Sequence, residues 1–193
     1  MKKLGFLMLA IALMLGGTAF AQGDNSVYFV TYYSNAHTTG APDATVRVIN
    51  DGNWSQVNPL YASFYVFDDS QELTQCCSCA TTADGITSES VNNELTAYPL
   101  RNIYNSRGVI KMISSSVYAG GPVGGNFTNK LQTGLRGWAT HIQRANAAYA
   151  VTETPLADAN LSASEESLLE SLCMFDLMLS GSNCRCTPED YDF

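Results

Sequence analysis

Cysteine is the residue type whose number and spacing carry the clearest chemistry in this sequence. The six cysteines fall into two groups, Cys76, Cys77 and Cys79, and then Cys173, Cys184 and Cys186. An even number in an exported chain predicts disulfides. Adjacent cysteines pair badly, because a bridge across one peptide bond is strained. We therefore expect up to three bridges between the groups, each closing a loop of about 100 residues. Local pairing of Cys173 with Cys184 or Cys186 stays open among the roughly 15 pairings that six cysteines allow.

A zinc site is the alternative for the same thiols, with His37 or His141 as an added ligand. Zinc sites favour two cysteines separated by two residues, because both sulfurs then reach one tetrahedral ion. The segments 77–79 and 184–186 each have a single residue between their cysteines. The spacing therefore favours disulfides over zinc.

Three acidic side chains offer a second kind of metal chemistry. Asp68, Asp69 and Glu72 follow an expected strand, and their oxygens are the ligand type that calcium prefers. The spacing of an EF-hand loop is absent, so a solvated turn is the default interpretation. We predict no cofactor, with calcium as the alternative for these three residues.

Five of the ten tyrosines crowd two expected strands: Tyr28, Tyr32, Tyr33, Tyr61 and Tyr65. Exposed tyrosines suit recognition of sugars or proteins, because they combine rigid area with a hydroxyl. Buried in a sandwich they would be ordinary core residues, which is the favoured interpretation.

Catalytic motifs are scarce. The sequence contains no Gly-x-Ser-x-Gly elbow, no His-Glu-x-x-His pair and no phosphate-binding loop. His37 and His141 are the two histidines, and either could act as a general base beside an acid. We predict no catalytic residues and no enzyme, with a secreted hydrolase around His141 as the less favoured alternative.

The first 21 residues have the features of a secretory signal peptide. Lys2 and Lys3 precede a short apolar stretch at 4–15, and Ala19 and Ala21 form a small-x-small cleavage site. Cleavage leaves a chain that starts at Gln22 and has no later stretch of about 18 apolar residues. The sequence therefore predicts a bacterial protein that is secreted, extracellular or periplasmic, without a membrane span after cleavage.

The charge balance limits the partners. Removing Lys2 and Lys3 takes the net charge from −8 to −10. Such an acidic chain has no basic surplus to neutralise phosphates, which argues against a nucleic-acid partner. Other proteins, or further copies of the chain itself, are the expected partners.

The elements that must position these residues are mostly short strands. Strand-like patterns cover 27–33, 45–49, 60–67, 86–90, 94–97, 109–115, 138–143 and 148–152. Segment 60–67 is apolar on both faces, which is typical of a central strand covered on both sides. The glycine-rich segment 119–129 is expected to be a loop. This spacing predicts a mainly β fold for 22–156, an antiparallel β-sandwich or an irregular barrel.

One α-helix is expected in the C-terminal part, 157–193. Ser162 and Glu165 form a capping box that starts a helix over 163–179. Its apolar stripe is Leu168, Leu172, Phe175 and Leu179. We expect this stripe to pack on the β core, with a partner-binding face as the alternative.

The order of several segments resembles a family of uncharacterised secreted bacterial proteins with no assigned activity. The most specific is 60–79, which ends in Cys-Cys-Ser-Cys, and the last is the Cys-x-Cys at 184–186. Other members often carry a cysteine near Tyr61 and another shortly after Ser115, and this chain has neither. The resemblance implies a secreted compartment and a shared fold, and it implies no mechanism.

Taken together, the residues predict a secreted, disulfide-stabilised structural or interaction protein. One version is a self-associating surface or filament subunit, in which strand 27–33 pairs with the sheet edge of a neighbour. The alternative is a module that binds carbohydrate or another small ligand, with calcium as an aid.

Overall fold

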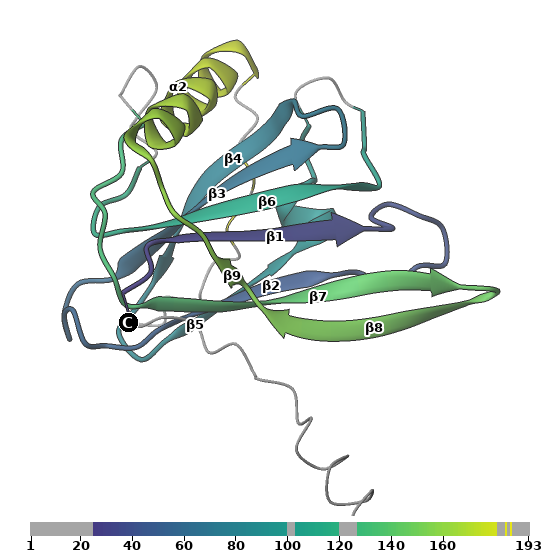
Figure 1. Cartoon of the computed structure of the whole chain (residues 1–193), viewed down its shortest axis with the longest axis horizontal. Coiled ribbons are helices and arrows are strands. Elements are labelled where there is room, and N and C mark those ends of the chain that lie inside the picture. The colour runs from purple at the N-terminus through teal and green to yellow at the C-terminus, as the bar shows by residue number, and fades with distance from the viewer. Residues whose placement is uncertain (1–24, 100–102, 120–126, 181–183, 185, 187–193) are drawn as a thin grey trace, which may run out of the picture.

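Two antiparallel sheets face each other, and one long helix covers the outer face of the larger sheet (Figure 1). The computed structural model describes residues 25–99, 103–119, 127–180, 184 and 186, with the backbone alone at 177–180. The expected signal peptide, 1–21, lies outside the described residues. The strands are β1 (Tyr28–Ser34), β2 (Thr45–Asn50), β3 (Leu60–Asp68), β4 (Leu73–Thr81), β5 (Ile86–Ser90), β6 (Arg107–Ser115), β7 (Leu135–Ala145), β8 (Ala148–Pro155) and β9 (Ala157–Asp158).

The five-stranded sheet has the order β4-β3-β6-β1-β9, and the four-stranded sheet has the order β5-β2-β7-β8. Every pairing between these strands is antiparallel. The two sheets do not close into a barrel. The mainly β sandwich expected from the sequence is therefore confirmed, and the irregular barrel is not found.

The main core lies between the sheets. Alternate residues of β3 point into it, and Leu60, Phe64 and Val66 are fully buried there. Tyr65 points to the other face of β3 and is equally buried, in a second cluster beneath the helix. The expectation that this strand is covered on both sides is confirmed, because the fold has three layers.

The helix α2 (Ala163–Ser180) begins close to the expected position. The backbone N–H of Glu165 donates to Ser162 Oγ at 3.1 Å, which is one half of the expected capping box. The expected apolar stripe is wrong in register. Leu168 and Phe175 are 50% and 59% exposed, whereas Leu169 and Cys173 are fully buried against the sheet. The side chain of Leu179 lies outside the described residues.

Two strand assignments also differ from expectation. The segment 94–97 is not a strand, because Val91–Leu95 forms one turn of π-helix that Ser90 caps by accepting from the N–H of Asn93. The strand β4, which contains the cysteine segment, was not expected from the sequence. No helix among the described residues is long and apolar enough to cross a membrane.

Candidate functional site

The cysteine segment is built on β4, an edge strand of the five-stranded sheet. Successive side chains of a strand point to opposite faces, so Cys76 points to the helix while Cys77 and Cys79 point between the sheets. Cys76 pairs with Cys173 of α2, and the two Cα atoms are 5.8 Å apart. This bridge fastens the helix to the outer face of the sheet.

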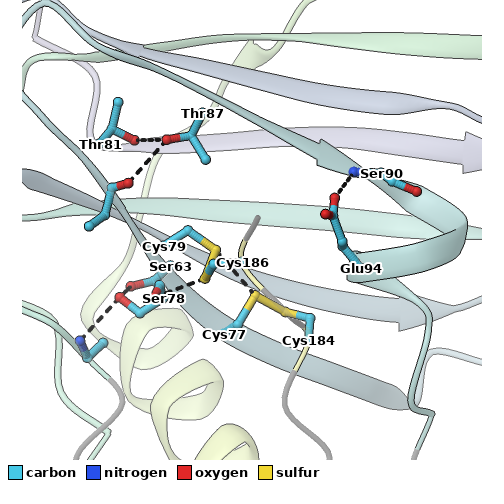
Figure 2. The surroundings of a disulfide bond; sticks show 12 residues. Ser63, Cys77, Ser78, Cys79, Thr81, Thr87, Ser90, Glu94, Cys184 and Cys186 are labelled. Carbon is cyan, nitrogen blue, oxygen red and sulfur yellow. Dashed lines mark hydrogen bonds between the residues drawn. A yellow bond between two sulfur atoms is a disulfide. The ribbon is translucent and has the colours of Figure 1, made fainter. Parts of the chain in front are cut away.

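The other two bridges lie on the inner face of the same strand (Figure 2). Cys77 pairs with Cys184 and Cys79 with Cys186, with Cα separations of 5.2 and 5.3 Å. The expected cross-pairing of the two groups is present, and the local pairing of Cys173 with the tail is not.

The two described residues of the tail, Cys184 and Cys186, also contact the backbone of β4. The backbone N–H of Cys184 donates to the carbonyl oxygen of Cys76 at 3.3 Å. The sulfur of Cys186 lies 3.3 Å from the carbonyl oxygen of Ser78. These contacts occupy backbone groups that an edge strand otherwise offers to another chain.

The sulfur atoms of Cys77, Cys79 and Cys186 form the one group of three metal-ligating side chains that converges within the described residues. All six cysteines are in disulfides. A disulfide sulfur is not a thiolate, so the oxidised protein offers zinc no thiolate ligand there.

The acidic candidates hold the β3–β4 turn. Asp68 Oδ1 accepts the backbone N–H groups of Ser70 and Glu72, each at 2.9 Å. Asp69 forms an ion pair with Arg107, at 2.7 Å between Oδ2 and Nε. Within the described residues the three carboxylates do not gather around one point. The turn itself explains their spacing.

The tyrosine candidates do not converge either. Tyr28, Tyr33 and Tyr65 are buried, and burial raises the pKa of each phenol well above its usual range. Tyr65 accepts a hydrogen bond from Asn129 Nδ2 at 2.7 Å beneath the helix. Tyr32 is 47% exposed and stacks on the ring of His141, with 4.2 Å between ring centroids.

Tyr61 is the tyrosine candidate that lines a surface pocket. Its ring meets that of Tyr118 edge to face, with 5.9 Å between centroids. Both tyrosines line a shallow pocket of about 470 Å³ with Pro59 and Cys186. Tyr118 was missed by the sequence analysis, because no strand pattern marked it.

A second groove, of about 540 Å³, lies between the β3–β4 turn and α2. Phe175 and Leu172 line it, so part of the expected stripe faces this groove instead of the core. Asp68, Glu72 and Ile103 also line it. The groove therefore combines apolar and acidic side chains.

The two histidines lie in different parts of the fold. His37 Nε2 is 2.7 Å from Thr96 Oγ1, in the loop after β1. His141 is buried in β7, with Nε2 at 2.8 Å from Thr154 Oγ1. Burial lowers the pKa of His141 below its ordinary value. Each imidazole thus has a threonine hydroxyl as its neighbour.

The edge strand β8 is the surface that the sequence analysis missed. Seven of its eight residues are exposed, and the hairpin that it forms with β7 extends past the neighbouring strands (Figure 1). Within the described parts of the chain, no strand pairs with its outer side. Its composition predicted a strand, but the pattern did not indicate an edge position.

Comparison with protein-family models, with curated proteins and with solved structures finds no match to this chain.

Proposed function

We propose that this chain is a secreted, disulfide-stabilised structural or interaction protein that works through its surfaces and without catalysis. The observation that carries the proposal is the triple disulfide attachment of the helix and tail to both faces of β4. Bridges of this kind persist in oxidising compartments outside the cytoplasm, which agrees with the expected export signal.

The surroundings of the histidines support a non-catalytic role. A general base must reach the proton that it removes, usually with an acid or nucleophile arranged around it. His141 is 4% exposed and lies between Tyr32 and Thr154. This position suits a structural hydrogen bond more than proton transfer to a substrate.

Genetic complementation tests the proposal. In cells that depend on this protein for a measurable phenotype, we expect a His37→Ala/His141→Ala variant to restore it fully. Secreted amounts of the variant should first be matched to wild type. Loss of the phenotype with a folded, exported variant would show that catalysis is required.

A binding module for carbohydrate or another small ligand is the second candidate, and one observation favours it. Tyr61 and Tyr118 line a pocket on the surface, and aromatic rings provide rigid area for sugar rings. A glycan array with wild type and Tyr118→Ala tests this candidate. Binding that the substitution abolishes supports it, and no binding by wild type, with and without calcium, rejects it.

A further inference from the structure

The four sheet edges of this fold differ in how they are closed. Cys184 and Cys186 contact backbone carbonyl groups of β4, and β9 is two residues long. At β5, the hydroxyl of Thr87 donates to the carbonyl of Ala80 on β4, at 3.1 Å, which joins the two sheets at that corner (Figure 2). The strand β8 is an edge of eight residues, and among the described residues no strand pairs with its outer side.

The strand β8 has few of the features that prevent an edge strand from pairing with a strand of another chain. Natural edges are protected by lysines, bulges, prolines or short length. The pairing of β8 with β7 is regular from Ala148 to Pro155, and no lysine occurs in it. Its one charged residue, Glu153, forms an ion pair with Arg47 of β2. Pro155 is the last residue of the strand, so it does not prevent backbone pairing at the middle of β8.

The residue pattern of β8 identifies the strand that fits this edge. Tyr149, Val151 and Glu153 share one face, because alternate residues of a strand lie on the same side. In an antiparallel pair of two β8 strands centred on Val151, Tyr149 of each copy lies opposite Glu153 of the other. The two Val151 side chains, each 55% exposed in the single chain, then cover one another.

The opposite face is equally compatible with this register. Ala148 lies opposite Thr154, and Ala150 lies opposite Thr152, so every pair combines two small side chains. A register shifted by two residues places Val151 opposite Glu153, and one shifted by four places the two glutamates opposite each other. The register centred on Val151 therefore avoids like charges and covers the exposed valine.

We propose that β8 pairs antiparallel with β8 of a second copy, around a two-fold axis at Val151. The two four-stranded sheets then form one continuous sheet of eight strands, and the interface is closed because the same surface is used by both copies. This deepens the proposed interaction role by naming the partner and the surface.

The expected dimer is weak. Two paired strands bury less than the roughly 1,200 Å² of a standard interface, and the expected dissociation constant is about 10 to 100 μM. The net charge of the chain opposes association, although Arg47 places one positive charge beside Glu153. Moderate salt should therefore strengthen the dimer.

Sedimentation equilibrium of the oxidised protein from about 5 μM to about 1 mM tests the pairing. Val151→Lys places two like charges at the axis, and we expect it to raise the dissociation constant at least about tenfold. The matched control is Leu168→Lys, since Leu168 is similarly exposed on α2, and it should leave the constant unchanged. A wild-type monomer throughout, or a dimer that Val151→Lys leaves intact, overturns the proposal.

Hydrogen exchange gives a second measurement that needs no substitution. Protection of the outward amides of β8 should rise with protein concentration, while that of β2 stays constant. Exchange that is independent of concentration overturns the pairing. The two proposals can fail separately. If the protein is a monomer and the histidine variant still restores the phenotype, the β8 pairing is wrong and the non-catalytic role is retained.

Discussion

The edge strands β4 and β8 show opposite solutions to the same problem. Both end a sheet and so present backbone groups that could pair with another chain. β4 carries three disulfides and has Cys184 and Cys186 beside it, whereas β8 is exposed over almost its full length. The two edges therefore differ in covalent attachment and in exposure, and the proposed pairing of β8 depends on this difference.

The ion pairs near the two edges also differ in how far they are buried. Glu165 of α2 accepts from Lys111 of β6 at 2.6 Å and from the hydroxyl of Tyr28 at 3.1 Å, in a half-buried position. Glu153 of β8 meets Arg47 at the surface. The region around β4 and α2 therefore combines disulfides with a half-buried ion pair, whereas the ion pair of β8 is more exposed and no disulfide reaches β8.

Reduction of all three disulfides should have the largest effect on the free energy of unfolding. A bridge that closes about 100 residues contributes roughly 4.7 kcal/mol to the free energy of unfolding, and three bridges contribute more than one but less than three times that value. We expect urea unfolding with reductant to show a loss of at least about 4.7 kcal/mol.

The location of the change distinguishes the two edges. Hydrogen exchange of the reduced protein should increase first in α2 and β4, and β8 should change least. Equal increases in both edges would contradict the division between them.

Removal of the single bridge between Cys76 and Cys173 should have a smaller effect. With the two inner bridges intact, this bridge closes only a short loop of about a dozen residues, which corresponds to roughly 3 kcal/mol. The variant Cys76→Ala/Cys173→Ala should therefore lose about 3 kcal/mol in urea unfolding from loop closure, and a cavity beneath α2 would add to this loss.

The sandwich of this variant should remain folded, since neither inner bridge is touched. Near-ultraviolet circular dichroism reports the buried aromatic rings and should keep most of its signal. Loss of the whole tertiary signal would show that helix and sandwich form one cooperative unit.

The sequence predicted most strands of this fold, and the reason for the main failure is specific. Strands with β-branched and aromatic residues, such as β1 and β3, were recognised because their composition favours extended backbone. β4 was missed, since cysteine, serine and glutamine carry no such preference. Its alternation explains why the adjacent Cys76 and Cys77 can enter two different bridges on opposite faces.

The spacing was compatible with the connectivity but did not select it. Cys77 and Cys79 are separated by one residue, as are Cys184 and Cys186, and both observed bridges span 107 positions. The crossed pairs, Cys77 with Cys186 and Cys79 with Cys184, fit the same spacing, so the sequence could not choose between them.

The candidate sites were less predictable than the fold. Helical spacing alone allowed a stripe through Leu168 or one through Leu169, and the position of Cys173 beside β4 selects the second. Likewise, the filament version required strand 27–33 to be available for a neighbour. In the structure β1 pairs with β6 along its whole length and with β9 at Phe29 and Val30, so part of its edge is covered.

Acid should destabilise the part of β7 and β8 around His141 and Thr154 more than it destabilises β4. Burial lowers the pKa of His141 in the folded protein below its ordinary value of 6.5, so the unfolded chain binds more protons just below that pH. The contribution of neutral His141 is therefore complete above about pH 6.5 and is lost as the pH falls toward the lowered pKa.

Urea unfolding between about pH 7.5 and 5 checks this expectation. His141→Gln should flatten the dependence, whereas His37→Gln should retain it. Hydrogen exchange should locate the acid effect at β7 and β8, where Thr154 contacts His141. An unchanged slope in His141→Gln would assign the pH dependence to other groups.

Removal of either ion pair should have the smallest effect on the free energy of unfolding, and it compares the two regions directly. Glu165→Gln removes a half-buried charge between β6 and α2, and we expect a loss of up to about 1 kcal/mol. Glu153→Gln removes an exposed charge, and the loss should be at most about 0.5 kcal/mol. Urea unfolding at low and high salt measures both, and the β8 pair should show the stronger dependence on salt, since exposed pairs are screened more. Equal losses would mean that the helix side has no advantage beyond its disulfides.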